Sequence, residues 1–69
     1  MKNYIKELRS SSKLSQAELA KICKVSRQTI NAIENDKYDP TLQLAFNIAN
    51  ALDTTVDRLF VNNPKYSKT

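Results

Sequence analysis

The stretch that most constrains the fold, SQAELAKICKVSRQTINAIEN, runs from Ser15 to Asn35 and predicts two short helices joined by a tight turn. Ser15 is followed three residues later by Glu18, which is the form of a capping box, so a helix should begin at Gln16. Ser26 supplies a fresh N-cap for a second helix. Two capped helices separated by about four residues have the layout of a helix-turn-helix unit.

Each of these two helices has an apolar side that should face a core. The period of about 3.6 residues per turn gathers the apolar side chains of each helix on one side and leaves the charged ones outward. The inward set is Leu19, Ala20, Ile22 and Cys23 in the first helix, and Ile30 and Ile33 in the second.

The outward face of the second helix carries side chains that suit DNA bases. Arg pairs bidentately with guanine, Gln or Asn pairs with adenine, and a Thr methyl group contacts the thymine methyl. The alternative interpretation is a solvated face, because most polar helix faces only meet water. The paired helix and the charge distribution favour DNA, and the expected base-reading residues are Arg27, Gln28, Asn31 and Thr29.

Groove geometry places a second set of residues against the DNA backbone. The second helix should enter the major groove N-terminus first while the first helix crosses the backbone, so helix N-termini and nearby lysines meet phosphates. This set is Gln16, Ser26, Asn35, Lys37, Lys13 and Thr41. The expected partner is therefore double-stranded DNA.

The net positive charge lies in the half of the chain that holds these residues. Residues 1–37 contain eight of the eleven Lys and Arg side chains and four of the seven Asp and Glu side chains, which gives 8 − 4 = +4. Residues 38–69 contain three basic and three acidic side chains, which cancel. This division is typical of a phosphate-binding surface.

The rest of the chain also predicts helices. We expect a first helix from Lys2 to Ser11, a fourth from Leu42 to about Leu52 capped by Thr41, and a short fifth helix capped by Thr55. The expected core side chains of these helices are Tyr4, Ile5, Leu8, Leu44, Ala45, Ile48, Ala49, Leu52, Val56, Leu59 and Phe60. Residues 1–61 should form one all-α domain, and residues 62–69 a tail that is flexible or contacts a dimer partner.

Composition excludes several classes of protein. There is no histidine and a single cysteine, Cys23, so neither an internal disulfide nor a Cys/His metal site is expected. No apolar run approaches the ~18 residues of a membrane span, and no signal peptide opens the chain, which favours the cytoplasm. Without histidine, a glycine-rich phosphate loop or a plausible carboxylate pair, neither an enzyme nor a cofactor is expected.

The run LSQAELAKICKVSRQTINAIENDKYDPTLQLAFNIANAL resembles the Xre, or lambda-repressor-like, family of helix-turn-helix domains, with SRQTINAIEN and KYDPTLQLA in that family's order and spacing. The resemblance covers about residues 2–61. It implies a five-helix domain that binds operator DNA, usually as a dimer, and regulates transcription. We expect repression, with activation as the alternative.

The same resemblance implies roles for individual residues. Arg9 should pair with Glu34 and brace the first helix against the third, and Ala32 should face the bases, where its methyl group can offer only a thymine contact. Relatives commonly place glycine in left-handed turns at the positions of Lys24, Asp36 and Asp53, whereas this chain contains no glycine. The left-handed conformation should cost more energy at Lys24 than at Asp36 or Asp53, since aspartate tolerates that conformation better.

Two alternatives to a DNA-reading regulator remain. An antitoxin-type regulator would use the same fold but have a protein as its main partner. A structural adaptor would have lost DNA recognition, although Arg27, Gln28 and Asn31 argue against that reading. By elimination and analogy, the homodimer surface should be the fifth helix and the tail, because the third helix must stay free.

Overall fold

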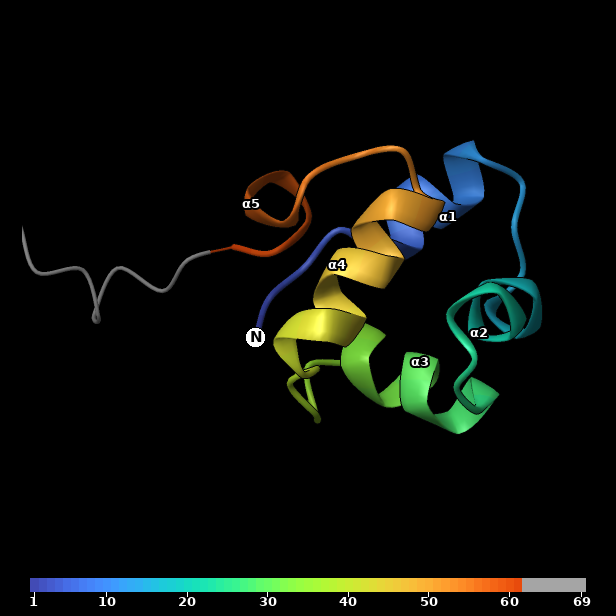
Figure 1. Ribbon diagram of the computed structural model, residues 1–69, viewed down its shortest axis with the longest axis horizontal. Helices are drawn as coiled ribbons and strands as arrows, with labels where there is room; N and C mark the ends of the chain where they lie inside the picture. The colour runs from blue at the N-terminus through green and yellow to red at the C-terminus, as the bar shows by residue number, and fades with distance from the viewer. Residues whose placement is uncertain (62–69) are drawn as a thin grey trace, which may run out of the picture.

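The computed structural model describes residues 1–61 and consists there of five helices, without strands longer than a single bridge (Figure 1). The helices are α1 (Ile5–Ser11), α2 (Gln16–Cys23), α3 (Arg27–Glu34), α4 (Leu42–Ala51) and α5 (Val56–Leu59). Helix α2 packs against α3 and α4, and α4 packs against α5. The predicted all-α, five-helix architecture is therefore confirmed.

One apolar core lies between the helices and draws on all five. Its completely buried members are Ile5, Leu19, Ile30, Ile33, Ile48 and Leu59, so every helix contributes at least one large aliphatic side chain. The predicted stripe of α4 is buried as expected. Within residues 1–61 no helix has both the length and the apolar character that crossing a bilayer requires.

Helices α2, α3 and α4 begin at the N-caps that the sequence predicts. The Ser15 hydroxyl accepts the Glu18 N–H at 3.0 Å, and Glu18 Oε1 accepts the Ser15 N–H at 2.8 Å, so the capping box is complete. The Ser26 and Thr41 hydroxyls cap α3 and α4 by accepting the Thr29 and Leu44 N–H groups, without the reciprocal bond of a capping box. Thr55 holds the N-cap position of α5 but makes no cap bond. The predicted cap bond is therefore absent there, and the neighbouring Thr55 hydroxyl lowers the pKa of the Asp57 carboxyl from its ordinary value.

The first helix begins at Ile5, three residues later than predicted from Lys2. Residues 2–4 pair instead with the end of α5 and the residues after it: the Tyr4 N–H donates to the Leu59 carbonyl at 2.9 Å, and the Val61 N–H donates to the Lys2 carbonyl at 2.8 Å. This pairing joins the two ends of the described chain, so local periodicity could not reveal it. Tyr4 is 44% exposed, and its prediction as a core residue is wrong.

Ile22 was also wrongly assigned to the core, since 54% of it is exposed. At about 100° per residue, Ile22 points roughly 100° away from the centre of the stripe formed by Leu19, Ala20 and Cys23. The three stripe residues are buried. Hydrophobicity alone therefore misplaced a residue that the helical period puts on the surface.

Helices α1 to α4 end in the same way, each with a left-handed residue that is not glycine. These residues are Lys13 (φ 59°), Lys24 (φ 59°), Asp36 (φ 62°) and Asp53 (φ 55°). The next residue donates its N–H to the carbonyl five positions earlier at 2.9 to 3.0 Å in all four cases, which is the Schellman pattern. The three expected positions are confirmed, and Lys13 is a fourth that the sequence did not indicate.

Candidate nucleic-acid interface

The turn between α2 and α3 is three residues long and fixes how α3 is presented. Lys24 adopts the left-handed conformation, and the Val25 N–H bonds the Ala20 carbonyl at 3.0 Å to close the end of α2. Ser26 then caps α3 through the Thr29 N–H at 3.1 Å. The first turn of α3 therefore carries its base-reading candidates directly after a well-defined bend.

One edge of the outward face of α3 is held against α2. The Asn31 amide donates to Gln16 Oε1 at 3.4 Å, and the Asn35 amide donates to the Asn31 side-chain oxygen at 3.2 Å and to its carbonyl at 2.9 Å. Asn31 and Asn35 are both exposed, so these bonds orient amides that still face solvent. Gln16 and Asn35, expected at phosphates, are thus also positioning partners of Asn31.

The opposite edge of α3 borders the loop that leads to α4. Gln28, Thr29 and Ala32 line an open, mainly apolar hollow there, together with Tyr38 from the loop. Gln28 and Ala32 are four residues apart and lie on one stripe of the helix. Tyr38 was absent from the predicted site, and its only signal in the sequence was being the one aromatic residue in the loop NDKYDP.

The predicted base-reading side chains differ in how free they are. Arg27 and Gln28 are exposed, and among residues 1–61 neither donates a hydrogen bond to another side chain or carbonyl. Thr29 is half-buried, and its hydroxyl lies 2.9 Å from the Ser26 hydroxyl. Ala32 is also half-buried. The two side chains most able to reach a base are therefore the pair at the N-terminus of α3.

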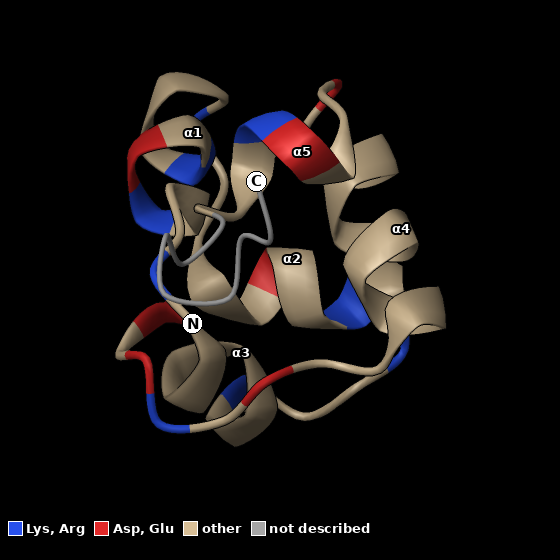
Figure 2. Cartoon of the chain, turned by 90° about the vertical axis from the view of Figure 1, so that its left-hand side faces the viewer, with Lys and Arg blue, Asp and Glu red and all other residues tan. Residues whose placement is uncertain are grey.

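The predicted phosphate contacts are likewise of two kinds. Lys13 and Lys37 are exposed cations, whereas the Ser26 and Thr41 hydroxyls serve as helix caps. Lys37 lies between acidic residues in a loop of alternating charge (Figure 2). A phosphate near this loop would be attracted by Lys37 but repelled by the carboxylates of Asp36 and Asp39. Lys13 has no acidic residue next to it in sequence, so its attraction for a phosphate is less opposed.

A largely buried ion pair lies behind α3, on the side away from its outward face. Arg9 Nε lies 2.8 Å from Glu34 Oε2, with Arg9 14% and Glu34 4% exposed at their side chains. Arg9 Nη1 also donates to the Leu14 carbonyl at 2.8 Å, and the Gln16 amide donates to Glu34 Oε1 at 3.0 Å. The pair implied by the family resemblance is thus present. It continues through Gln16 to Asn31, which links α1, α2 and α3 to the exposed face.

The N-terminal amine ties the loop after α3 to the start of the chain. It bonds the carboxylates of Asp36 and Asp39, the latter at 2.7 Å, and these carboxylates raise the pKa of the amine from its ordinary value of 8.0. The Asn3 amide donates to the Ile33 carbonyl at 2.8 Å at the end of α3. Both contacts fix the loop that carries Lys37 and Tyr38.

Residues 1–61 contain no group of three or more His, Cys, Asp or Glu side chains placed to hold a metal ion. Cys23 is buried, and this burial raises the pKa of its thiol, which keeps it protonated near neutral pH.

A family model described as helix-turn-helix matches residues 5–59, which include all five helices. The chain belongs to this helix-turn-helix family. An uncharacterized HTH-type transcriptional regulator of Methanocaldococcus jannaschii is 49% identical over 61 residues, which are 88% of this chain and 92% of that one. The predicted membership of the Xre-type helix-turn-helix family is therefore confirmed. This helix-turn-helix protein is a DNA-binding regulator and not an enzyme.

Two solved structures share this fold. The restriction-modification controller protein C.AhdI from Aeromonas hydrophila has a TM-score of 0.75 at 30% identity, covering 81% of this chain and 85% of that chain. A chain of the SinR protein/SinI protein complex has a TM-score of 0.77 at 24% identity, covering 94% of this chain and 64% of that chain. The second likeness shows the shared fold alone.

Proposed function

We propose that this helix-turn-helix protein is a cytoplasmic repressor that binds a pseudo-palindromic operator as a homodimer, with α3 in the major groove. The observation that carries the proposal is the face of α3. Arg27 and Gln28 extend from it without side-chain hydrogen bonds to other described residues, next to an Asn31 amide that Gln16 and Asn35 orient. Repression needs only occupancy of the operator, whereas activation needs a further contact with the transcription machinery.

The residues divide into readers and anchors. Arg27 reads a guanine through its bidentate guanidinium, Gln28 and Asn31 read adenines, and Ala32 and Thr29 contact thymine methyl groups. Gln16, Ser26, Asn35, Lys37, Lys13 and Thr41 position the domain on phosphates and carry no sequence information. The Arg9–Glu34 pair keeps α3 at the angle that these contacts require.

A dimer supplies the specificity that one domain lacks. Two half-sites about 34 Å apart place two copies on one face of the duplex. Helix α5 lies at one end of the long axis and the α2–α3 turn lies toward the other, so pairing through α5 leaves α3 free (Figure 1).

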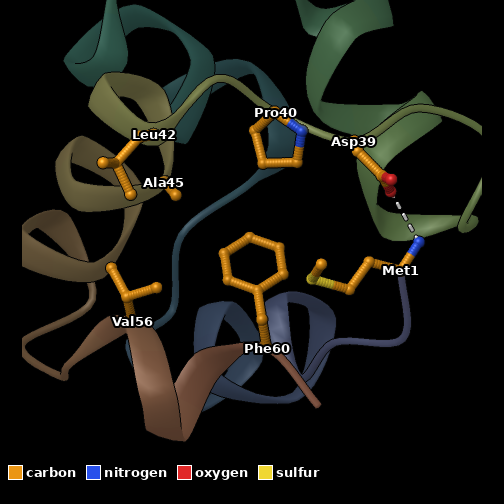
Figure 3. Close-up of a pocket in the computed structure, with 7 residues that line it drawn as sticks. All are labelled: Met1, Asp39, Pro40, Leu42, Ala45, Val56 and Phe60. Atoms are coloured by element: carbon orange, nitrogen blue, oxygen red, sulfur yellow. Dashed lines mark hydrogen bonds and ion pairs between the residues drawn. The ribbon is translucent and has the colours of Figure 1, made fainter. Parts of the chain in front are cut away.

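An apolar pocket next to α5 supports that dimer surface (Figure 3). Leu42, which is 69% exposed, borders it, and Phe46 one turn later on α4 is 49% exposed. The other lining residues are Met1, Asp39, Pro40, Ala45, Val56 and Phe60. The predicted tail contact, residues 62–69, lies outside the described residues.

The same pocket favours a second candidate function, in which another protein is the main partner, as in antitoxin-type regulators. An apolar surface bordered by exposed Leu42 suits a foreign chain as well as a second copy. A chain of the SinR protein/SinI protein complex shares this fold and was solved with a protein partner.

A selection experiment separates the two functions. The purified protein is incubated with a randomised duplex library at two salt concentrations, and the bound DNA is sequenced. Enrichment of an inverted repeat with half-site centres about 10 base pairs apart supports the dimeric repressor. Salt-sensitive binding without enrichment, or no binding, contradicts it and favours the protein partner.

A further inference from the structure

The hollow beside α3 is built from parts that have no role in packing the core. Tyr38 is 49% exposed, and among residues 1–61 its side chain makes no hydrogen bond. It lines the same open hollow as Gln28, Thr29 and Ala32. The exposed Tyr38 ring adds apolar surface to this edge of α3, where the other lining side chains are small or polar.

The chemistry of the hollow suits a small apolar group. The methyl group of Ala32, the methylene groups of Gln28 and the ring of Tyr38 are its apolar surfaces. The Thr29 hydroxyl already bonds Ser26 at 2.9 Å, so it does not demand a polar ligand. On the major-groove edge of a base pair, the one apolar group is the 5-methyl of thymine.

The loop that carries Tyr38 is held in place, as a specificity element must be. The N-terminal amine bonds Asp36 and Asp39 on either side of Tyr38, and the Lys37 N–H bonds the Ala32 carbonyl at 2.9 Å. The chain on both sides of Tyr38 is therefore tied to α3 or to the N-terminus.

We propose that the hollow between Gln28, Ala32 and Tyr38 seats the 5-methyl group of one thymine in each half-site. Tyr38 is then a specificity-determining residue although it lies outside the helix-turn-helix unit. This inference rests on the proposed function, since it needs α3 in the major groove. The opposing use of Tyr38 is a hydroxyl that donates to a phosphate, which would strengthen all sequences equally.

The test replaces thymines of the selected operator by uracil, one position at a time, and measures affinity for the wild-type protein and three variants. For wild type we expect one position in each half-site to lose about fourfold in affinity, the cost of one buried methyl group. Tyr38→Ala should abolish this difference between thymine and uracil. Tyr38→Phe should retain it, because the ring remains.

Tyr4→Ala is the matched control, because Tyr4 is a similarly exposed tyrosine on another part of the molecule and should leave the ratio unchanged. A flat uracil scan, an unchanged ratio in Tyr38→Ala, or a uniform loss in Tyr38→Phe would each overturn the inference while specific binding remains. Failure of the wild-type protein to enrich any sequence would instead overturn the proposed function, and this inference with it.

Discussion

Four left-handed residues replace the glycines that would ordinarily end helices α1 to α4. A side chain in this conformation costs about 1 kcal/mol, and two of the four are lysines, which gain no local hydrogen bond from it. The left-handed residue sets the direction in which the chain leaves each helix and so places the next one. This matters most at Lys24, which lies in the turn before α3.

Replacing Lys24 or Lys13 by glycine should therefore stabilise the protein by about 1 kcal/mol each. Lys21→Gly is the matched control, since it puts glycine inside α2 and should destabilise by about 0.5 to 1 kcal/mol. Urea unfolding of the three variants measures all of these changes. A destabilised Lys24→Gly protein would contradict the assigned turn.

The capping box of α2 predicts a dependence of stability on acid. The Ser15 N–H and then the Ser15 hydroxyl lower the pKa of Glu18 from its ordinary value of 4.5. A lowered folded-state pKa gives stability that is present above pH 4.5 and is lost as the pH falls through the lower value.

Glu18→Gln should remove that part of the pH dependence, because the amide keeps an oxygen for the Ser15 N–H but does not titrate. Unfolding midpoints between pH 5 and pH 3 measure the difference. Identical pH profiles for the two proteins would show that protonation of Glu18 does not change the stability of the capping box.

At the scale of elements, the Arg9–Glu34 pair is the main polar bond between α1 and α3. Arg9→Met leaves the Glu34 carboxylate, 4% exposed, without its cation, and should cost about 3 to 5 kcal/mol. Adding Glu34→Gln should recover part of the loss, because the uncompensated charge is gone. A thermodynamic cycle of the two single variants and the double variant measures the coupling.

Arg58→Ala is the control for that cycle, since Arg58 is exposed on α5 and should change stability by no more than about 0.5 kcal/mol. An Arg9→Met protein as stable as wild type would mean that the pair does not brace α3.

Helices α2, α3 and α4 could be predicted from the sequence because each carries a hydroxyl cap followed by a regular apolar stripe. The start of α1 could not, because residues 2–4 are held by pairing near Phe60, far away in sequence. Arg27, Gln28 and Asn31 followed from helical period, but Tyr38 did not. It joins the site through the fold of a loop, which side-chain periodicity does not encode.

At the scale of the whole molecule, the apolar pocket between α4 and α5 predicts self-association. Leu42→Lys should weaken the dimer by at least about tenfold, because it places a charge where apolar surfaces meet. Gln43→Lys, on the adjoining exposed position of α4, should have little effect. Sedimentation equilibrium measures both, and a Leu42→Lys dimer of wild-type affinity would contradict this surface.

Base reading by α3 can be tested by repeating the randomised-duplex selection with Arg27→Ala. The preference at one G·C pair in each half-site should relax, with a loss of about 1 to 3 kcal/mol on the wild-type operator, while the other positions keep theirs. Lys37→Ala should instead weaken all sequences alike and reduce the salt slope by about 1. Selection of the same motif by Arg27→Ala, with the same preference at every position, would contradict base reading by Arg27.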